Sequence, residues 1–143
     1  MGQITPQLVK ELREKTGAGM GDCKNALVEA DGDLKAAIEI LRKKGAASAA
    51  KRSDRSANEG IVTSKTNENS TEAAIVELNC ETDFVARNAE FENYADTLVN
   101  TILKTKVNTL DELFAQKVGD DSIQGMHNEI LAKFSENIAV RRF

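Results

Sequence analysis

Reactive side chains are few in this 143-residue chain, and their spacing builds no catalytic centre. Cys23 and Cys80 lie far apart on faces predicted to point inward, where a free thiol usually packs as a small apolar group. They form no Cys-x-x-Cys pair, and with one histidine they complete no zinc site without carboxylate ligands. His127 lies on the polar flank of a predicted helix, where a lone histidine is usually exposed or half-buried. The sequence therefore predicts no catalytic residue, metal ligand set or cofactor.

A glycine-rich segment at residues 17–21 superficially resembles a phosphate-binding loop. It follows a predicted helix instead of a strand, and it lacks the Lys-Ser/Thr pair of a P-loop. A tight turn between two helices is the better interpretation, because glycines end a helix and let the chain reverse. Met20 lies at the tip of this turn, and its apolar side chain is either tucked under or offered to a partner.

The residues between a predicted strand and a long helix carry more suggestive chemistry. Residues 82–88 read Thr-Asp-Phe-Val-Ala-Arg-Asn, and Asp83 and Phe84 precede the regular apolar stripe that begins at Phe91. Spacing alone favours a helix cap followed by a hydrophobic staple into the core. The alternative is that Asp83 and Phe84 project from the corner, joining a carboxylate to an aromatic wedge on a rigid support.

The elements that precede this corner are predicted to be three short amphipathic helices. Thr5 and Pro6 suit the N-cap and first position of a helix that Gly17 ends. A second helix is expected from Asp22 and a third from near Asp33, each with apolar residues at i, i+3, i+4 and i+7. Such stripes can be buried only against one another, which predicts a compact three-helix module.

The end of this module is less sharply defined in the sequence. Gly45 is the expected stop of the third helix, although the Ala-rich sequence after it could extend the helix. Residues 46–58 are small and charged without an apolar stripe, which is typical of a solvated helix tail or linker.

The remainder of the chain begins with two predicted β-strands, in which apolar and polar residues alternate. Residues 60–65 and 74–80 are rich in β-formers, and Val76, Leu78 and Cys80 share one predicted face. The polar tract between these segments predicts a hairpin loop. Three helices are then expected, one over residues 91–102 with Thr82 or Asp83 as N-cap, one at residues 110–114 capped by Thr109, and one over residues 123–134. Residues 138–143 resemble a strand cut short, which suggests a fragment or a strand whose neighbours lie elsewhere.

Composition excludes several classes of protein. With 29% charged residues, a mean hydropathy of -0.39 and no apolar run near the roughly 18 residues needed to cross a bilayer, the chain is neither a membrane protein nor typically disordered. Residues 1–5 (Met-Gly-Gln-Ile-Thr) do not begin a basic region followed by an apolar one, and two cysteines are too few for a disulfide scaffold. The expected compartment is the cytoplasm, with an organellar matrix or stroma after processing as the alternative.

The net charge of -4 divides unevenly, into +3 over residues 1–58 and -7 over residues 59–143. Affinity for nucleic acid depends largely on the number of phosphates that are neutralised. The acidic second part therefore argues against wrapping nucleic acid, and it leaves a basic partner surface possible.

Several motifs in one order resemble the elongation factor Ts family, the guanine-nucleotide exchange factors of elongation factor Tu. The most specific is the segment at residues 82–88, and the others lie at residues 8–20, 22–27, 41–45, 59–60 and 136–142. The resemblance covers essentially the whole chain. It implies an α+β fold, with a three-helix ubiquitin-associated-like domain and linker over residues 1–55 and the first half of the family core, an antiparallel hairpin with packed helices, over residues 56–143.

The resemblance also implies a site, formed by Thr82, Asp83, Phe84 and Val85. In this family the Asp-Phe pair enters the GTPase domain of elongation factor Tu near the magnesium ion, and the Phe wedges between helices so that GDP leaves. The implied partner is elongation factor Tu, GDP-bound and nucleotide-free, with no direct binding to nucleic acid or membrane. No bond is made or broken, so the chain is not expected to be an enzyme.

A second contact is implied at the N-terminal module, where Leu12, Met20 and Lys24 match the family's docking surface. Paired methionines are common at the turn in this family, and the Met20-Gly21 pair here removes one apolar contact. Most members also continue into a second core half. We therefore expect a truncated or short member that exchanges nucleotide more weakly.

Two alternatives come from other classes of protein. A ubiquitin-associated-like module can hold apolar peptides, which predicts binding through the first 50 or so residues without a nucleotide effect. A small redox or hydrolytic enzyme would require a reactive thiol at Cys23 or Cys80, or a base at His127.

Overall fold

The computed structural model describes residues 4–143, so the opening of the chain at residues 1–3 lies outside the described residues. The chain forms two compact units. Unit 1 contains the described residues up to Lys51 together with Asn128–Ser135, and unit 2 contains Arg52–His127 and Glu136–Phe143. Helices and an antiparallel sheet confirm the predicted α+β class. The proposed domain limits and domain names stay predictions.

Unit 1 begins with three helices, α1 (Pro6–Thr16), α2 (Met20–Glu29) and α3 (Leu34–Ala50). The predicted start of α1 is confirmed, because the Thr5 hydroxyl accepts a hydrogen bond from the Leu8 amide at 3.2 Å. Gly17 ends this helix in the left-handed conformation at φ 67°. Asp33 caps α3 by accepting from the Ala36 amide at 2.8 Å.

These helices bury their apolar stripes against one another, as the spacing predicts. The core of unit 1 consists of Val9, Leu12, Ala18, Cys23, Ala26, Leu27, Ala37 and Leu41. Small side chains from α2 and α3 let the helices approach closely, which suits a core without aromatic residues. Local sequence spacing thus accounts for the packing of this three-helix core.

Two helix boundaries in unit 1 differ from prediction. Helix α2 begins at Met20 instead of Asp22, and α3 continues beyond Gly45 to Ala50. Gly45 serves close packing instead of helix termination, since a Cβ there would lie 2.7 Å from the Cβ of Ala132. Ala132 belongs to the last helix, α7 (Ile123–Lys133), whose final residues are part of unit 1.

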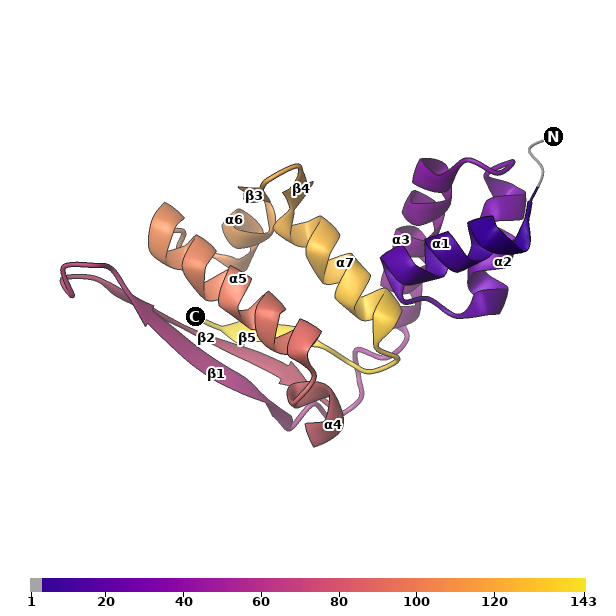
Figure 1. Cartoon of the computed structure of the whole chain (residues 1–143). Helices are drawn as coiled ribbons and strands as arrows, with labels where there is room; N and C mark the ends of the chain where they lie inside the picture. The colour runs from indigo at the N-terminus through magenta and orange to yellow at the C-terminus, as the bar shows by residue number, and fades with distance from the viewer. Residues whose placement is uncertain (1–3) are drawn as a thin grey trace. The chain divides into compact units, whose positions relative to one another are not determined.

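Unit 2 is built on a three-stranded antiparallel sheet in the order β1 (Glu59–Thr66), β2 (Ala73–Cys80) and β5 (Ala139–Arg142). The predicted hairpin is confirmed, and its register pairs Ile61 with Leu78. The strand-like end of the chain is also confirmed as a strand, and it finds its partner within this chain because Val140 pairs with Leu78. Figure 1 shows the hairpin loop and the one-turn helix α4 (Asp83–Ala86) at opposite ends of β2.

Helix α5 (Ala89–Thr105) covers one face of this sheet (Figure 1). The predicted stripe is buried, with Phe91, Tyr94, Ala95, Leu98, Val99 and Ile102 on its inner side. They pack over the buried face of β2, formed by Ala74, Val76, Leu78 and Cys80. This face is the one that alternation predicts, because Glu77 and Asn79 lie between its members.

The remaining elements of unit 2 complete its helical layer. The short helix α6 (Leu110–Phe114) has the predicted Thr109 cap, which forms a capping box with Glu112. A small hairpin of β3 (Lys117–Val118) and β4 (Asp121–Ser122) was not predicted. Its strands have two residues each, too few for a period to be recognised. Among the described residues, no helix is both long and apolar enough to span a membrane.

Candidate functional site

The corner between β2 and α5 presents an exposed aromatic side chain. Thr82 or Asp83 was predicted to cap the long helix, and this is wrong: Thr82 caps the separate helix α4, and Asn88 caps α5. Asp83 and Phe84 are therefore the first two residues of a single helical turn. Phe84 is 83% exposed, so the hydrophobic staple favoured by spacing alone is wrong for this residue.

The Glu136 carboxylate ties this corner to a distant part of unit 2. Its Oε2 atom accepts hydrogen bonds from the backbone amides of Glu81 at 3.0 Å and Thr82 at 3.1 Å. Its Oε1 atom accepts from the Thr82 hydroxyl at 2.5 Å. The same hydroxyl accepts from the Val85 amide at 3.5 Å, closing the turn of α4.

A second set of hydrogen bonds is donated by Asn137, the residue after Glu136. The Asn137 backbone amide donates to Glu81 Oε1 at 2.6 Å, and an Arg55 nitrogen lies 3.6 Å from the same oxygen. The Asn137 side-chain amide donates to the carbonyl oxygens of Ser53 at 3.2 Å and Arg55 at 2.7 Å. Hydrogen bonds thus join three segments of unit 2 into one support for the corner, at residues 53–55, 81–82 and 136–137.

The Asp83 side chain is about half exposed and lies at the start of α4, where the helix dipole favours a negative charge. Arg87 Nη2 lies 3.6 Å from Asp83 Oδ2 at the other end of the same turn. The pair is solvated and contributes little to stability. The corner therefore offers an accessible carboxylate beside the Phe84 ring.

Cys80 supports the corner from the core side. Its buried thiol donates to the Thr82 carbonyl at 3.1 Å. Desolvation, helped by the negative charge of Glu136, raises the pKa of Cys80 to about 11, so the thiol stays protonated at neutral pH. The pKa of Cys23 is also raised by burial. Both cysteines have the inward placement that the sequence predicts and act as packing groups.

His127 is buried, not exposed or half-buried as predicted. Its Nδ1 atom lies 2.9 Å from the Tyr94 hydroxyl, and its ring meets Phe114 edge-on at 5.1 Å. Desolvation lowers the pKa of His127 to about 4 and raises that of Tyr94. The histidine is a neutral part of the unit 2 core at physiological pH.

The three residues expected to form the N-terminal docking surface differ in exposure. Met20 is 49% exposed at the first position of α2, and Lys24 is exposed one turn later. Leu12 is completely buried in the core of unit 1, so its side chain supports the turn and is not itself presented to a partner.

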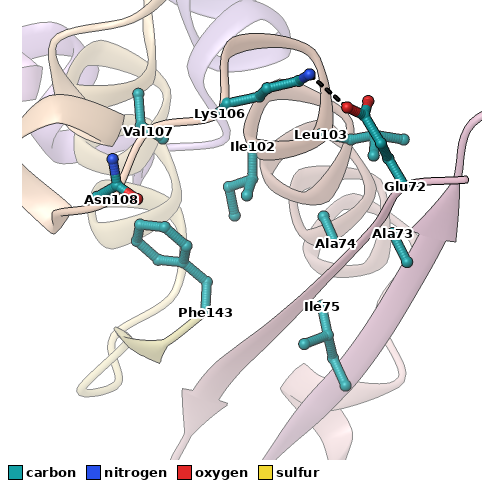
Figure 2. A pocket seen from close by; sticks show the side chains of 10 residues that line it. All are labelled: Glu72, Ala73, Ala74, Ile75, Ile102, Leu103, Lys106, Val107, Asn108 and Phe143. Carbon is teal, nitrogen blue, oxygen red and sulfur yellow. Dashed lines mark hydrogen bonds and ion pairs between the residues drawn. The ribbon is translucent and has the colours of Figure 1, made fainter.

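A cavity of about 450 Å³ in unit 2 contains none of the predicted site residues. Figure 2 shows it between the hairpin end of β2 and the end of α5, with Ile102 and Phe143 on its walls and Glu72 bonded to Lys106 at its rim. Within the described part of the chain, no group of histidine, cysteine and carboxylate side chains could hold a metal ion. The candidate site is therefore the exposed corner itself, outside this cavity.

Comparison with known proteins shows which proteins this chain is similar to. Residues 81–143, which include the corner and its Glu136 support, match the family model described as "Elongation factor TS". Curated relatives named elongation factor Ts are 51% identical in Clostridium perfringens and 52% identical in Clostridium kluyveri, each over 98% of this chain. The relative from Halorhodospira halophila is 47% identical over 98% of this chain. The resemblance to elongation factor Ts inferred from the motifs is therefore confirmed.

These alignments cover nearly all of this chain but less than half of each relative. The chain spans 46% of the Clostridium perfringens protein, 47% of the Clostridium kluyveri protein and 48% of the Halorhodospira halophila protein. Nearly all of this chain thus corresponds to about half the length of the curated relatives it matches.

Proposed function

We propose that this chain promotes release of GDP from elongation factor Tu by inserting Asp83 and Phe84 near the magnesium and phosphate site of the GTPase. The observation that carries the proposal is the 83% exposure of Phe84 on a short helix tied to the sheet corner. A large aromatic ring held in water gains free energy when a partner pocket covers it. The similarity to proteins named elongation factor Ts supports elongation factor Tu as the partner.

The two side chains have complementary tasks in this mechanism. Phe84 supplies buried apolar area between elements of the GTPase, and Thr82 and Val85 flank it at the ends of the same turn. Asp83 brings a carboxylate oxygen toward a hard cation that prefers oxygen ligands and keeps several waters. Displacing the water shell or the ligands of that cation weakens the hold on the GDP phosphates.

The effect is a difference in binding free energies, not a chemical reaction. The chain accelerates release only if it binds the nucleotide-free partner more tightly than the GDP-bound partner. GDP must then weaken binding of this chain by the same factor. The proposed role is therefore that of an exchange factor and not an enzyme, and it needs no cofactor.

The N-terminal module supplies a second contact in this proposal. Met20 offers a flexible apolar side chain and Lys24 a positive charge on the same exposed stretch of α2. Leu12 supports this contact indirectly, because its buried side chain fills the core of unit 1. We place the activity in the cytoplasm, with protein as the partner instead of nucleic acid or membrane.

The test is release of fluorescent GDP from elongation factor Tu as the chain is titrated in. We expect acceleration that is lost when Asp83→Ala and Phe84→Ala are combined. Ile75→Ala is the matched control, because Ile75 is also a large apolar side chain, 55% exposed, on unit 2. No acceleration at saturating chain, or full acceleration by the double variant, would refute the proposal. Binding of an apolar peptide without any effect on GDP would favour the peptide-binding alternative.

A further inference from the structure

We propose that Glu136 is a positioning residue for the Asp83-Phe84 pair, so that the exchange rate depends on a carboxylate more than fifty positions further along the chain. This inference rests on the proposed function and adds a residue to its machinery. Glu136 accepts hydrogen bonds from Glu81 and Thr82, and it acts on the pair through Thr82.

The first step of the argument is that α4 cannot hold itself in place. It has four residues, far below the length at which an isolated helix is stable in water. Among these residues only Ala86 is buried, at 9% exposure. Phe84 adds no anchoring contact of its own, since most of its surface faces solvent. The orientation of the ring must therefore come from the backbone on either side of the turn.

The second step is that Glu136 anchors the side of the turn that enters from β2. Two successive amides, of Glu81 and Thr82, donate to one carboxylate oxygen, and the Thr82 hydroxyl donates to the other. Hydrogen bonds to an ionised acceptor are stronger than those between neutral groups. Three such bonds fix both the backbone path and the side-chain rotamer of the residue that directly precedes Asp83.

The third step concerns the Thr82 hydroxyl, which has one proton and two lone pairs. Because the proton is donated to Glu136, a lone pair is directed to the Val85 amide, where it caps α4. Without Glu136 the hydroxyl would be free to rotate and to donate to water. The Glu136 carboxylate therefore links the N-cap of α4 to the segment that precedes β5.

The segment that carries Glu136 is itself held. Asn137 donates its backbone amide to Glu81 and its side-chain amide to the carbonyls of Ser53 and Arg55. The backbone of Glu81 thus binds a side chain at position 136, while its own side chain binds the backbone at position 137. The bonds from Asn137 to Ser53 and Arg55 attach the segment to a third stretch of the chain, so Glu136 is not held by the corner alone.

The experiment compares Glu136→Gln with Glu72→Gln, which removes the same charge at the other end of the hairpin. For Glu136→Gln we expect the maximal rate of GDP release to fall about tenfold, the factor that loss of a charged hydrogen bond supports, while the half-saturating concentration changes little. Amide hydrogen exchange at Val85 and Ala86 in the chain alone should accelerate by a similar factor. Glu72→Gln should leave both unchanged.

A double-mutant cycle separates positioning from general destabilisation. On the Phe84→Ala background, Glu136→Gln should have a clearly smaller effect on the maximal rate, because only Asp83 remains to be positioned. An undiminished effect on that background, or unchanged amide exchange at Val85 and Ala86, would overturn the inference. The amide-exchange result needs no partner, so failure of the proposed function would not conceal it.

A second pair of variants applies if Glu136→Gln fails to fold. Thr82→Ser keeps the hydroxyl that joins Glu136 to Val85, and Thr82→Val removes it while preserving the shape of the side chain. We expect Thr82→Ser to retain the rate and Thr82→Val to lose it about tenfold, again as one charged hydrogen bond supports. Equal rates for the two variants would contradict the positioning role.

Discussion

Met20 in unit 1 and Phe84 in unit 2 are both exposed apolar residues in the first turn of a helix, but the two helices begin differently. Helix α2 has Gly19 as its N-cap, with no side-chain hydrogen bond. Helix α4 has Thr82, whose hydroxyl is bonded both to its own helix and to Glu136. One start is thus set by local turn geometry, and the other by groups distant in sequence.

This difference indicates different roles for the two surfaces. A methionine has three rotatable bonds and adapts to a partner, at a cost in side-chain entropy on binding. A phenylalanine on a fixed support is already oriented, so little binding free energy is spent on ordering it. We therefore expect Met20 to govern affinity and Phe84 to govern the extent to which the partner is distorted.

The largest expected effect tests whether the unit 1 surface depends on its core. Leu12→Ala removes a completely buried side chain and should destabilise unit 1 by about 3 to 5 kcal/mol. Amide hydrogen exchange in α1 and α2 should accelerate strongly, whereas amides in α5 should remain protected. Leu8→Ala is the control, since Leu8 is only partly buried on the same helix. Protected α1 amides in Leu12→Ala would contradict this assignment.

Acid should act selectively on unit 2 through His127. Its pKa is lowered to about 4 in the folded protein, below the ordinary value of 6.5, so the unfolded chain binds the proton more tightly. The contribution of the neutral ring is complete above pH 6.5 and is lost as the pH falls through 4. The free energy of unfolding should decrease by about 3 kcal/mol over that window.

Denaturant titrations of the wild type and His127→Gln between pH 4 and pH 7 would measure this contribution. Glutamine can still bond to the Tyr94 hydroxyl but cannot take up the proton. The difference between the two proteins should shrink toward acid pH. Parallel pH profiles would show that His127 is not the group responsible.

Two threonine caps allow the same chemical change to be made in both units. Thr5→Ala should cost about 1 kcal/mol, the usual value of an N-cap. Thr82→Ala should cost about 2 kcal/mol, because it also removes a hydrogen bond to the Glu136 carboxylate. Denaturant unfolding of each variant measures these free energies. Equal costs would mean that the bond to Glu136 adds nothing to stability.

The smallest expected effect is that of Met20→Ala on nucleotide exchange. The half-saturating concentration should rise about fivefold, as loss of a partly buried apolar contact supports, and the maximal rate should stay unchanged. Phe84→Ala should instead reduce the maximal rate and leave the half-saturating concentration nearly unchanged. Titration of each variant against GDP-loaded elongation factor Tu provides both values. A reduced maximal rate for Met20→Ala would remove the distinction between the two surfaces.

The sequence predicted a structural feature correctly where the residues that determine it lie close together along the chain. The caps at Thr5, Asp33 and Thr109 each involve the residue three positions later, so residue type and spacing predict them. The hairpin and the buried stripe of α5 follow from periods of two and of 3.6 residues in the same way.

Prediction failed where distant residues decide the outcome. Thr82 caps α4 and is bonded to Glu136, a pairing that no local pattern contains, whereas the Asn88 cap that begins α5 is local and was missed. Gly45 lies within α3 and packs closely against Ala132, a residue far along the chain, whereas glycine as a residue type suggests a stop. Leu12 was implied by the resemblance to be part of the docking surface, and its side chain is completely buried in the core of unit 1.

The packing of Ala132 against Gly45 also has a consequence for the order of events during synthesis. The three helices of unit 1 can form as soon as they emerge, but Ala132, which packs on Gly45, follows 87 residues later. At translation rates of about 5 to 20 residues per second, this face of α3 waits for on the order of 10 seconds before it is covered. Glycine leaves that waiting surface small, with no side chain of its own to attract other apolar groups.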